Sequence, residues 1–188
     1  MRFERLFADL EGQLEAADQA DLAAEVSDRT RHARAQVLLA DRFRASLGAG
    51  VRLRLLGGGL LEGTVRGVGS DWLLIRDGLD ADVLVRPEAV LEVGGIAGAA
   101  RPAGGTVADR VTLRYLLGGL VRSRSTVTLG LVDGSSLVGT IDAVGADALD
   151  LGSSRLDEPA EWASASGRPA RSTTRVVPLA ALVVIREQ

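Results

Sequence analysis

The sequence predicts a mainly β protein in which a helical N-terminal region precedes two copies of one five-stranded unit. Two observations support this prediction. The first is an internal repeat, because residues 51–75 and 127–151 align without gaps and share 11 of 25 positions. The second is a change in apolar spacing, from a helical period before residue 48 to strict alternation from Val51 onward. The shared residues are typical of turns and of an apolar core, so the repeat predicts a fold unit rather than a functional site.

The N-terminal region, residues 1–47, has the composition of a helix. It contains no Pro and is rich in Ala, Leu, Glu, Gln and Arg. Five apolar residues recur at spacings of four and three along one stripe: Phe3, Phe7, Leu10, Leu14 and Ala17. The stripe fades after residue 18 and resumes at Val37, so we expect one long bent helix or a hairpin broken near Ser27. Ser27 and Asp28 are the expected cap of a second helix, and Gly48 its expected stop. The stripe is suited either to packing on the chain's own strands or to pairing helices between subunits.

Strand signals begin at Val51, where apolar residues alternate with arginines. The expected strands of the first copy are 51–55, 60–68, 72–76, 83–85 and 90–93. Gly57 to Gly59 predicts a turn, and Gly63 inside the second strand predicts a bulge or sharp bend. Pro87 interrupts the chain before the last strand.

The second copy repeats this ending, with Pro178 before an apolar run at 182–185. Asp133-Gly134 is its hairpin signal. Pro87 and Pro178 lie 91 residues apart, whereas earlier equivalent positions lie 76 apart. The alignment therefore predicts 15 extra residues between the third and fourth strands, within a long mobile loop at 152–175. Residues 94–105 read as a linker, and 107–122 are expected to be partly helical.

The repeat resembles the Sm-like small β-barrel found in Sm, LSm and Hfq-type proteins. The motif runs from hydrophobic-x-Leu, through Gly-Thr-Val or Gly-Thr-Ile, to Val-Gly-x-Asp-x-Leu, and ends with a Pro before a final strand. It is also similar to small barrels of ribosome-maturation factors. The resemblance covers about residues 29–93 and 107–185, and it implies two tandem five-stranded bent barrels, each preceded by a helix. The predicted organisation is an N-terminal helical region (1–48), a first barrel (49–95), a linker and helix (96–125), and a second barrel (126–188).

In Sm-like proteins, RNA is held by the turn between strands two and three and by the turn between strands four and five. Carried over to this chain, the first turn supplies Asp71 and Trp72, with Asp147 and Ala148 in the second copy. The second turn supplies Arg86 and, in the second copy, Val177. Two parts of the family pattern are absent from both copies: the Asn that follows the first Asp, and the Arg-Gly of the second motif.

Charge is uneven along the chain, although the formal net charge is −3. Residues 1–28 hold eight acids against two arginines, whereas residues 29–54 hold seven arginines against one acid. Arginine binds phosphates through forked hydrogen bonds, and a Trp can stack on a base. The predicted nucleic-acid site is therefore Arg29, Arg31, Arg34, Arg42, Arg44, Arg52, Arg54, Trp72 and Arg86. The alternative is a solvated face for the arginines and a core or interface role for Trp72.

Other chemistry is limited by composition. The absence of Cys excludes disulfides and thiolate metal sites, and a single His excludes the common zinc sites. Asp71 and Asp147 recur at one repeat position, which suits either a carboxylate pair or two turn-stabilising side chains. No set of nucleophile, base and orienting residue can be assembled, so we expect no enzyme and no cofactor. The absence of a long apolar run or a signal peptide predicts a cytoplasmic protein.

These observations predict a non-catalytic binding or assembly module, an RNA-associated or transcription-linked regulator. The alternative is a structural adaptor whose barrels scaffold an N-terminal helix that binds a protein partner. A third hypothesis has the 152–175 loop closing over a small ligand. Exposed edge strands commonly pair with neighbours, so a homo-oligomer is expected as well.

Overall fold

The computed structural model describes residues 19, 22, 24–32, 34–153 and 174–188, and the chain divides into two compact units, 1–38 and 39–188. In the first unit, residues 24–32 form uninterrupted helix. The predicted break near Ser27 is therefore wrong, since Ser27 and Asp28 lie inside the helical run and regular helix ends before residue 36. The apolar stripe from Phe3 to Ala17 lies outside the described residues.

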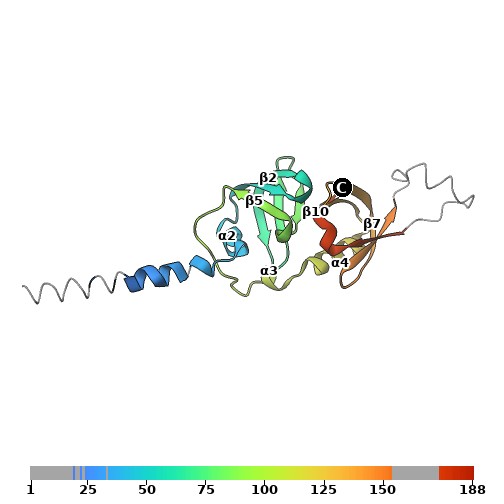
Figure 1. The fold of residues 1–188 in the computed structure, drawn as a ribbon. Helices are drawn as coiled ribbons and strands as arrows, with labels where there is room; N and C mark the ends of the chain where they lie inside the picture. The colour runs from blue at the N-terminus through green and yellow to red at the C-terminus, as the bar shows by residue number, and fades with distance from the viewer. Residues whose placement is uncertain (1–18, 20–21, 23, 33, 154–173) are drawn as a thin grey trace, which may run out of the picture. The chain divides into compact units, whose positions relative to one another are not determined.

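The second unit holds ten strands in one sheet and three short α-helices, one before the first strand and two between the fifth and sixth (Figure 1). The first half contains α2 (Leu39–Ala45), β1 (Gly50–Leu55), β2 (Leu60–Val68), β3 (Leu73–Asp77), β4 (Asp82–Val85) and β5 (Val90–Gly94). The second half contains α3 (Val107–Arg110), α4 (Leu113–Ser123), β6 (Thr126–Leu131), β7 (Ser136–Val144), β8 (Ala148–Ser153), β9 (Thr174–Pro178) and β10 (Leu182–Glu187). Single 3-10 turns lie at Leu56–Gly58, Pro87–Ala89 and Leu179–Ala181.

The ten strands form a single open antiparallel sheet in the order β5-β1-β2-β3-β4-β10-β6-β7-β8-β9. The prediction of two tandem five-stranded barrels is therefore wrong. β4 does not close onto β5 of its own copy but pairs with β10 of the other, with Val85 opposite Val184 and Leu84 opposite Ile185. The backbone groups of both inner edges are satisfied by this join, which leaves β5 and β9 as the outer edges.

Two apolar cores extend across the join between the halves. β1 buries Val51, Leu53 and Leu55, as the alternation predicts. Val183 of β10 is buried in this first core, whereas Trp72, which precedes β3, is buried in the second. Each half thus contributes a side chain to the other's interior, so both halves belong to the same packed unit.

The strand pairing gives a different alignment of the two copies from the one that matches Pro87 with Pro178. Leu73 pairs with Val85, and Leu149 pairs with Val177. Leu149 follows Leu73 by 76 residues, whereas Val177 follows Val85 by 92. The insertion is therefore 16 residues, one more than predicted, and Val177 corresponds to Val85 rather than to Arg86. The prolines misled the alignment because Pro178 ends β9 whereas Pro87 begins a 3-10 turn.

The predicted loop at 152–175 begins and ends in strand. Gly152 of β8 pairs with Thr174 of β9. Residues 154–173 lie outside the described part of the chain.

The repeated glycines Gly63 and Gly139 allow close approach of neighbouring strands. A Cβ on Gly63 would lie 2.2 Å from the Arg76 carbonyl oxygen, and a Cβ on Gly139 would lie 2.2 Å from that of Gly152. The expected bulge does not fall at Gly63, since the register shifts between Val65 and Gly67. The glycine is required by packing, which an alternating pattern does not reveal.

Substituting Gly63→Ala should lower the free energy of unfolding by about 1–3 kcal/mol, because β2 and β3 must separate to admit the methyl group. Urea unfolding followed by circular dichroism measures this loss. Gly98→Ala is the matched control, since a Cβ there meets nothing within 4 Å. Equal stability of the two variants would contradict the close-approach explanation.

Candidate nucleic-acid interface

Most of the predicted arginines are neutralised by nearby acids. On the strands, Arg52 pairs with Glu62 at 2.6 Å and Arg54 with Glu92 at 2.9 Å. Arg86 donates to the Leu179 carbonyl at 2.6 Å and lies 3.3 Å from Glu88. In the first unit, Arg29 pairs with Glu25 at 2.7 Å and Arg31 with Asp28 at 3.4 Å. The pairs on the sheet connect neighbouring strands and leave little net charge there for a phosphate.

Two further predicted arginines have no acidic partner among the described residues. Arg34 is exposed, and Arg42 donates from Nε to the Ala97 carbonyl at 3.4 Å. They belong to different units of the chain.

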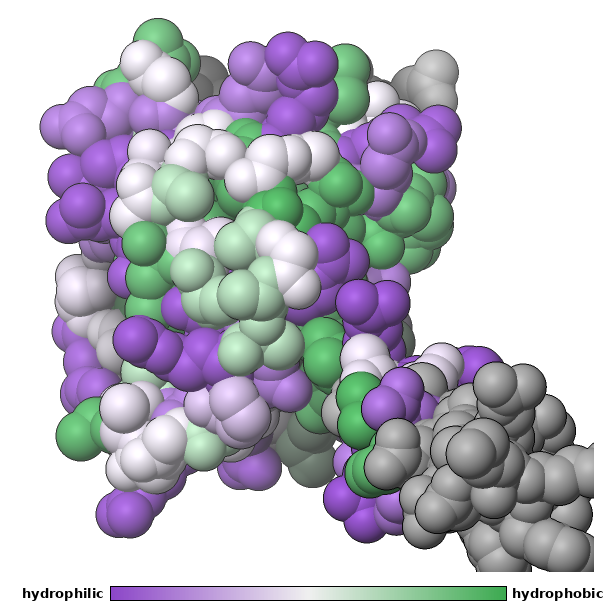
Figure 2. Space-filling view, turned by 90° about the vertical axis from the view of Figure 1, so that its left-hand side faces the viewer, coloured by the Kyte–Doolittle hydropathy of each residue, from purple (hydrophilic) through white to green (hydrophobic). Residues whose placement is uncertain are grey.

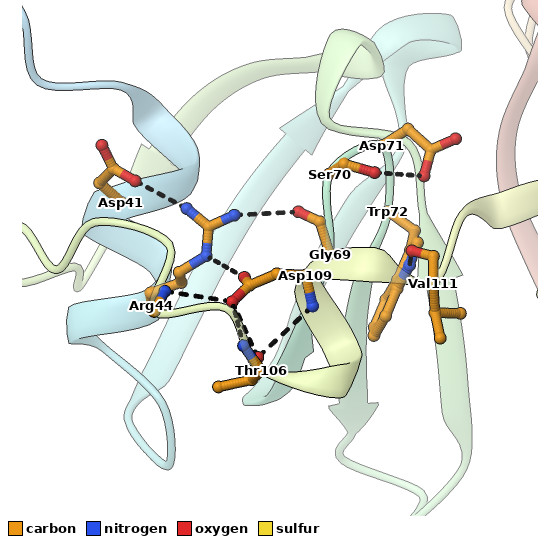
Figure 3. Close-up of polar contacts among 10 residues, drawn as sticks. Asp41, Arg44, Gly69, Ser70, Asp71, Trp72, Thr106, Asp109 and Val111 are labelled. Carbon is orange, nitrogen blue, oxygen red and sulfur yellow. Dashed lines mark hydrogen bonds and ion pairs between the residues drawn. The ribbon is translucent and has the colours of Figure 1, made fainter.

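Arg44 is the centre of a polar network that joins three segments (Figure 3). Its guanidinium donates to Asp41 at 2.6 Å, to Asp109 at 3.1 Å and to the Gly69 carbonyl at 3.5 Å. These partners lie in α2, in α3 and in the turn after β2. Because the side chain is largely buried and each of its three nitrogens donates to a protein oxygen, Arg44 acts as a structural clamp rather than as a phosphate ligand.

Trp72 lies on the other side of the same turn and has a core role. Its ring is buried, and its Nε1 donates to the Val111 carbonyl at 2.8 Å (Figure 3). A Cβ on Gly69 would lie 2.1 Å from that nitrogen, so the glycine makes room for the indole. Trp72 thus attaches the segment between α3 and α4 to the first half of the sheet, and its ring is not exposed for base stacking.

The two repeated aspartates have different environments. The Asp71 carboxylate accepts from the Leu113 amide at 2.8 Å, at the start of α4. Asp147 is exposed, and its main-chain carbonyl accepts from Leu179 at 2.7 Å. Asp71 therefore stabilises a helix N-terminus 42 residues away, and the structure does not support a carboxylate pair.

The segment held by these contacts carries the exposed positive charge that the predicted site lacks. From Arg110 to Val132 the chain contains no acid. Four arginines in this stretch are exposed and have no ion pair among the described residues: Arg110, Arg114, Arg122 and Arg124. This arrangement is a concentrated cationic surface in an otherwise acidic chain.

α4 places much of this charge on one face. Arg114, Gly118 and Arg122 are spaced four residues apart, so they share a side of the helix. The ring of Tyr115 is 64% exposed beside them. Leu113 and Leu117 are buried in the second core and anchor the helix to the sheet. We call the exposed side of α4, with Arg114, Tyr115, Gly118, Gly119 and Arg122, the α4 basic face.

A groove at the start of α3 adds two more arginines. Arg66 of β2 and Arg101 of the linker are exposed and line a groove of about 460 Å³ with Leu47, Pro102 and Ala108. In Figure 1, α3 and α4 follow one another along the lower side of the sheet. All the exposed arginines named here except Arg66 therefore lie on one connecting segment that runs from the first half to the second, and Arg66 lines the groove from β2.

No protein-family model and no curated protein matches the chain. The resemblance to Sm-like proteins stays a prediction about the repeat. Within the described ranges, no helix is long and apolar enough to cross a membrane. The same part of the chain shows no group of three or more side chains able to hold a metal ion.

Sequence reasoning missed the α4 basic face although a signal was present. The arginines are densest between residues 29 and 54, but most of those face an acid in the structure. The absence of acids from Arg110 to Val132 is visible in the sequence and identifies the segment. Which arginines elsewhere are neutralised depends on strand register, which the sequence alone does not show.

Asp109 makes the clamp around Arg44 dependent on pH. The Thr106 hydroxyl, the Thr106 amide and Arg44 donate to its carboxylate and hold the pKa of Asp109 below the ordinary value of 3.8. The ionised carboxylate of Asp109 therefore stabilises the folded state, and this contribution is fully present above pH 3.8. It is lost as the pH falls through the lower pKa that Asp109 has in the folded state.

The variant Asp109→Asn should therefore be less stable than wild type at neutral pH, and the difference should shrink below pH 3.8. Urea unfolding at a series of pH values measures both. Asp147→Asn is the control and should change the free energy of unfolding by less than about 0.5 kcal/mol at neutral pH. A difference for Asp109→Asn that stays constant with pH would contradict the assignment.

Proposed function

We propose that the chain is a non-catalytic module that binds single-stranded nucleic acid through the α4 basic face, as an RNA-associated or transcription-linked regulator in the cytoplasm. One observation carries the proposal. The arginines of α4 are exposed in a stretch without acids, whereas Arg52, Arg54 and Arg76 on the sheet are paired with acids. Selective neutralisation leaves one strongly cationic surface, and a polyphosphate is the chemistry that such a surface recognises.

The geometry of α4 suits a phosphate backbone. Arg114 and Arg122 present planar guanidinium groups that can hold phosphate oxygens with two hydrogen bonds each. Between them, Gly118 and Gly119 carry no side chain, and a Cβ on either would meet only the Arg122 guanidinium, at 3.9 Å. A strand can therefore approach the helix backbone closely between the two arginines.

Tyr115 favours a single strand over a duplex. Its exposed ring lies next to Arg114, where an unpaired base can stack while its phosphate contacts the arginine. Paired bases in a duplex do not offer a free ring face at the backbone. The proposal therefore assigns affinity to the arginines and strand preference to the tyrosine.

The adaptor alternative rests on the apolar stripe from Phe3 to Ala17. Because that stripe lies outside the described residues, the adaptor hypothesis stays a prediction from sequence.

The double variant Arg114→Ala/Arg122→Ala should weaken binding of a labelled single-stranded RNA by roughly tenfold or more at low salt, since two phosphate contacts are lost. The slope of log affinity against log salt should become shallower by about 1.4, at about 0.7 for each contact. Fluorescence anisotropy across a salt series measures both quantities.

The control is Arg52→Ala/Arg54→Ala, which removes the same charge from arginines that are already paired with acids. It should change the affinity by less than about twofold. If both double variants weaken binding equally, net charge rather than the α4 basic face is responsible. If wild type binds no single strand at low salt, the proposal fails.

Tyr115→Ala should weaken binding by about 1 kcal/mol, or roughly fivefold, and leave the salt slope unchanged, because stacking releases no counterions. Tyr115→Phe keeps the ring and should bind as wild type does. The same anisotropy series measures both variants. A Phe variant as weak as the Ala variant would show that the ring does not stack.

A further inference from the structure

The linker between β5 and α3 follows a fixed path beside α2, although residues 95–106 form no helix or strand. The Ala97 amide donates to the Ser46 hydroxyl at 2.9 Å, and the Arg101 amide donates to the Asp41 carbonyl at 2.9 Å. These bonds hold the linker as one wall of the groove that it forms with β2, the end of α2 and the start of α3. We call this groove the α3 groove, and its walls are in place before any ligand binds.

The α3 groove combines an apolar lining with two unpaired cations. The apolar side chains that line it are Leu47, Val68, Pro102 and Ala108. Arg66 lines it from β2 and Arg101 from the linker, and neither forms an ion pair within the described ranges. Figure 2 shows the side of the second unit on which α2 and the linker lie, and hydrophobic and hydrophilic residues adjoin there. The volume of about 460 Å³ is that of a site for a small molecule.

The other two charged residues of the lining are already occupied. Arg44 and Asp109 bond to each other at 3.1 Å. The Asp109 carboxylate also accepts from the Thr106 amide at 3.0 Å. The groups left to meet a ligand are therefore the guanidinium groups of Arg66 and Arg101.

A β-bulge determines the position of Arg66. The register of β2 against β3 shifts between Val65 and Gly67, so Arg66 is the extra residue of the bulge. β7 has its bulge at the same place, and the extra residue there is Asp142. Arg66 and Asp142 occupy one position of the repeat, 76 residues apart. The bulge therefore does not require an arginine, and the positive charge is particular to the copy whose β2 lines the α3 groove.

The two cations and the open apolar lining indicate the chemistry of the ligand. A phosphomonoester carries close to two negative charges at neutral pH, so it can accept forked hydrogen bonds from both arginines. A flat ring can place one face on apolar side chains and leave its polar edge in water, whereas an alkyl chain in an open groove would stay partly hydrated. An aromatic group joined to a phosphomonoester satisfies both parts of the groove.

We propose that the α3 groove binds a free nucleoside monophosphate. Arg66 and Arg101 hold its phosphate, and its base lies against Leu47 and Pro102. This site is separate from the α4 basic face, and its ligand is a small molecule rather than a nucleic-acid strand.

The first test titrates adenosine monophosphate into the full chain by isothermal titration calorimetry. The nucleotide should bind at one site per chain. Adenosine, which lacks the phosphate, and ribose 5-phosphate, which lacks the base, should each bind about tenfold more weakly or worse, because each loses one half of the contacts. No binding of the nucleotide, or equal affinity for either fragment, would overturn the proposal.

The second test uses variants of the two arginines. Arg66→Ala and Arg101→Ala should each weaken nucleotide binding by about tenfold or more, since each removes charge-assisted hydrogen bonds. Arg66→Asp gives the first copy the residue that the second has at its bulge, so it should keep the fold and lose binding. Arg110→Ala is the control: it removes an exposed arginine outside the groove and should change the affinity by less than about twofold.

Circular dichroism should show that the variants remain folded. Unchanged affinity of Arg66→Asp, or an equal loss in Arg110→Ala, would contradict the assignment of the groove.

The third test separates a free nucleotide from the end of a strand. One single-stranded RNA, prepared with and without a 5′-phosphate, competes with bound adenosine monophosphate. The two strands should compete equally. Stronger displacement by the phosphorylated strand would show that the groove holds a strand end, and the proposal of a free ligand would fail. Titration of the nucleotide alone involves no strand, so this proposal and that of the α4 basic face succeed or fail separately.

Discussion

The antiparallel pairing of β4 with β10 is the interaction on which the rest of the second unit depends. Without it, each half would have two open edges and an incomplete core, because Val183 lies in the first core and Trp72 in the second. With it, the repeat becomes one ten-stranded sheet whose inner backbone groups are paired. The same join explains the outer edges. It pairs β4 of the first copy with β10 of the second, so their counterparts β9 and β5 are left at the two ends of the sheet.

The connecting segment is the second consequence of this arrangement. It must pass from β5 at one outer edge to β6 beside the join, and polar contacts determine its path. Arg44 holds α3, Trp72 holds the residue after α3, and Asp71 holds the start of α4. All three anchors lie in the first half or in the helix before it, whereas α4 packs its apolar side on the second. This support presents the α4 basic face on a fixed element rather than on a loose linker.

The helices that precede the two copies differ in the partners of their arginines. α2 precedes the first copy and α4 the second, yet the arginines of α2 bond to Asp41, Asp109 and the carbonyl of Ala97, whereas those of α4 are free of acids. The helix before the first copy thus serves as a clamp, whereas the helix before the second carries exposed arginines. Neutralisation by neighbours, rather than the number of arginines, distinguishes these two roles.

The sequence by itself determined the local elements of this protein: the repeat, the alternation that buries Val51, Leu53 and Leu55, and the glycines that recur in the second strand of each copy. These follow from side-chain period and backbone conformation, which act over a few residues. Only the tertiary structure decided that β4 pairs with β10 and that Arg52 and Arg54 form ion pairs with acids. It also decided that equivalent residues after the insertion lie 92 positions apart in the sequence. Those outcomes depend on which strand, distant in the sequence, pairs with the open edge of each half. Because the two copies have similar sequences, each edge has two similar candidate strands. The physical choice between them is made by packing, because only the join across copies buries Val183 and completes both cores.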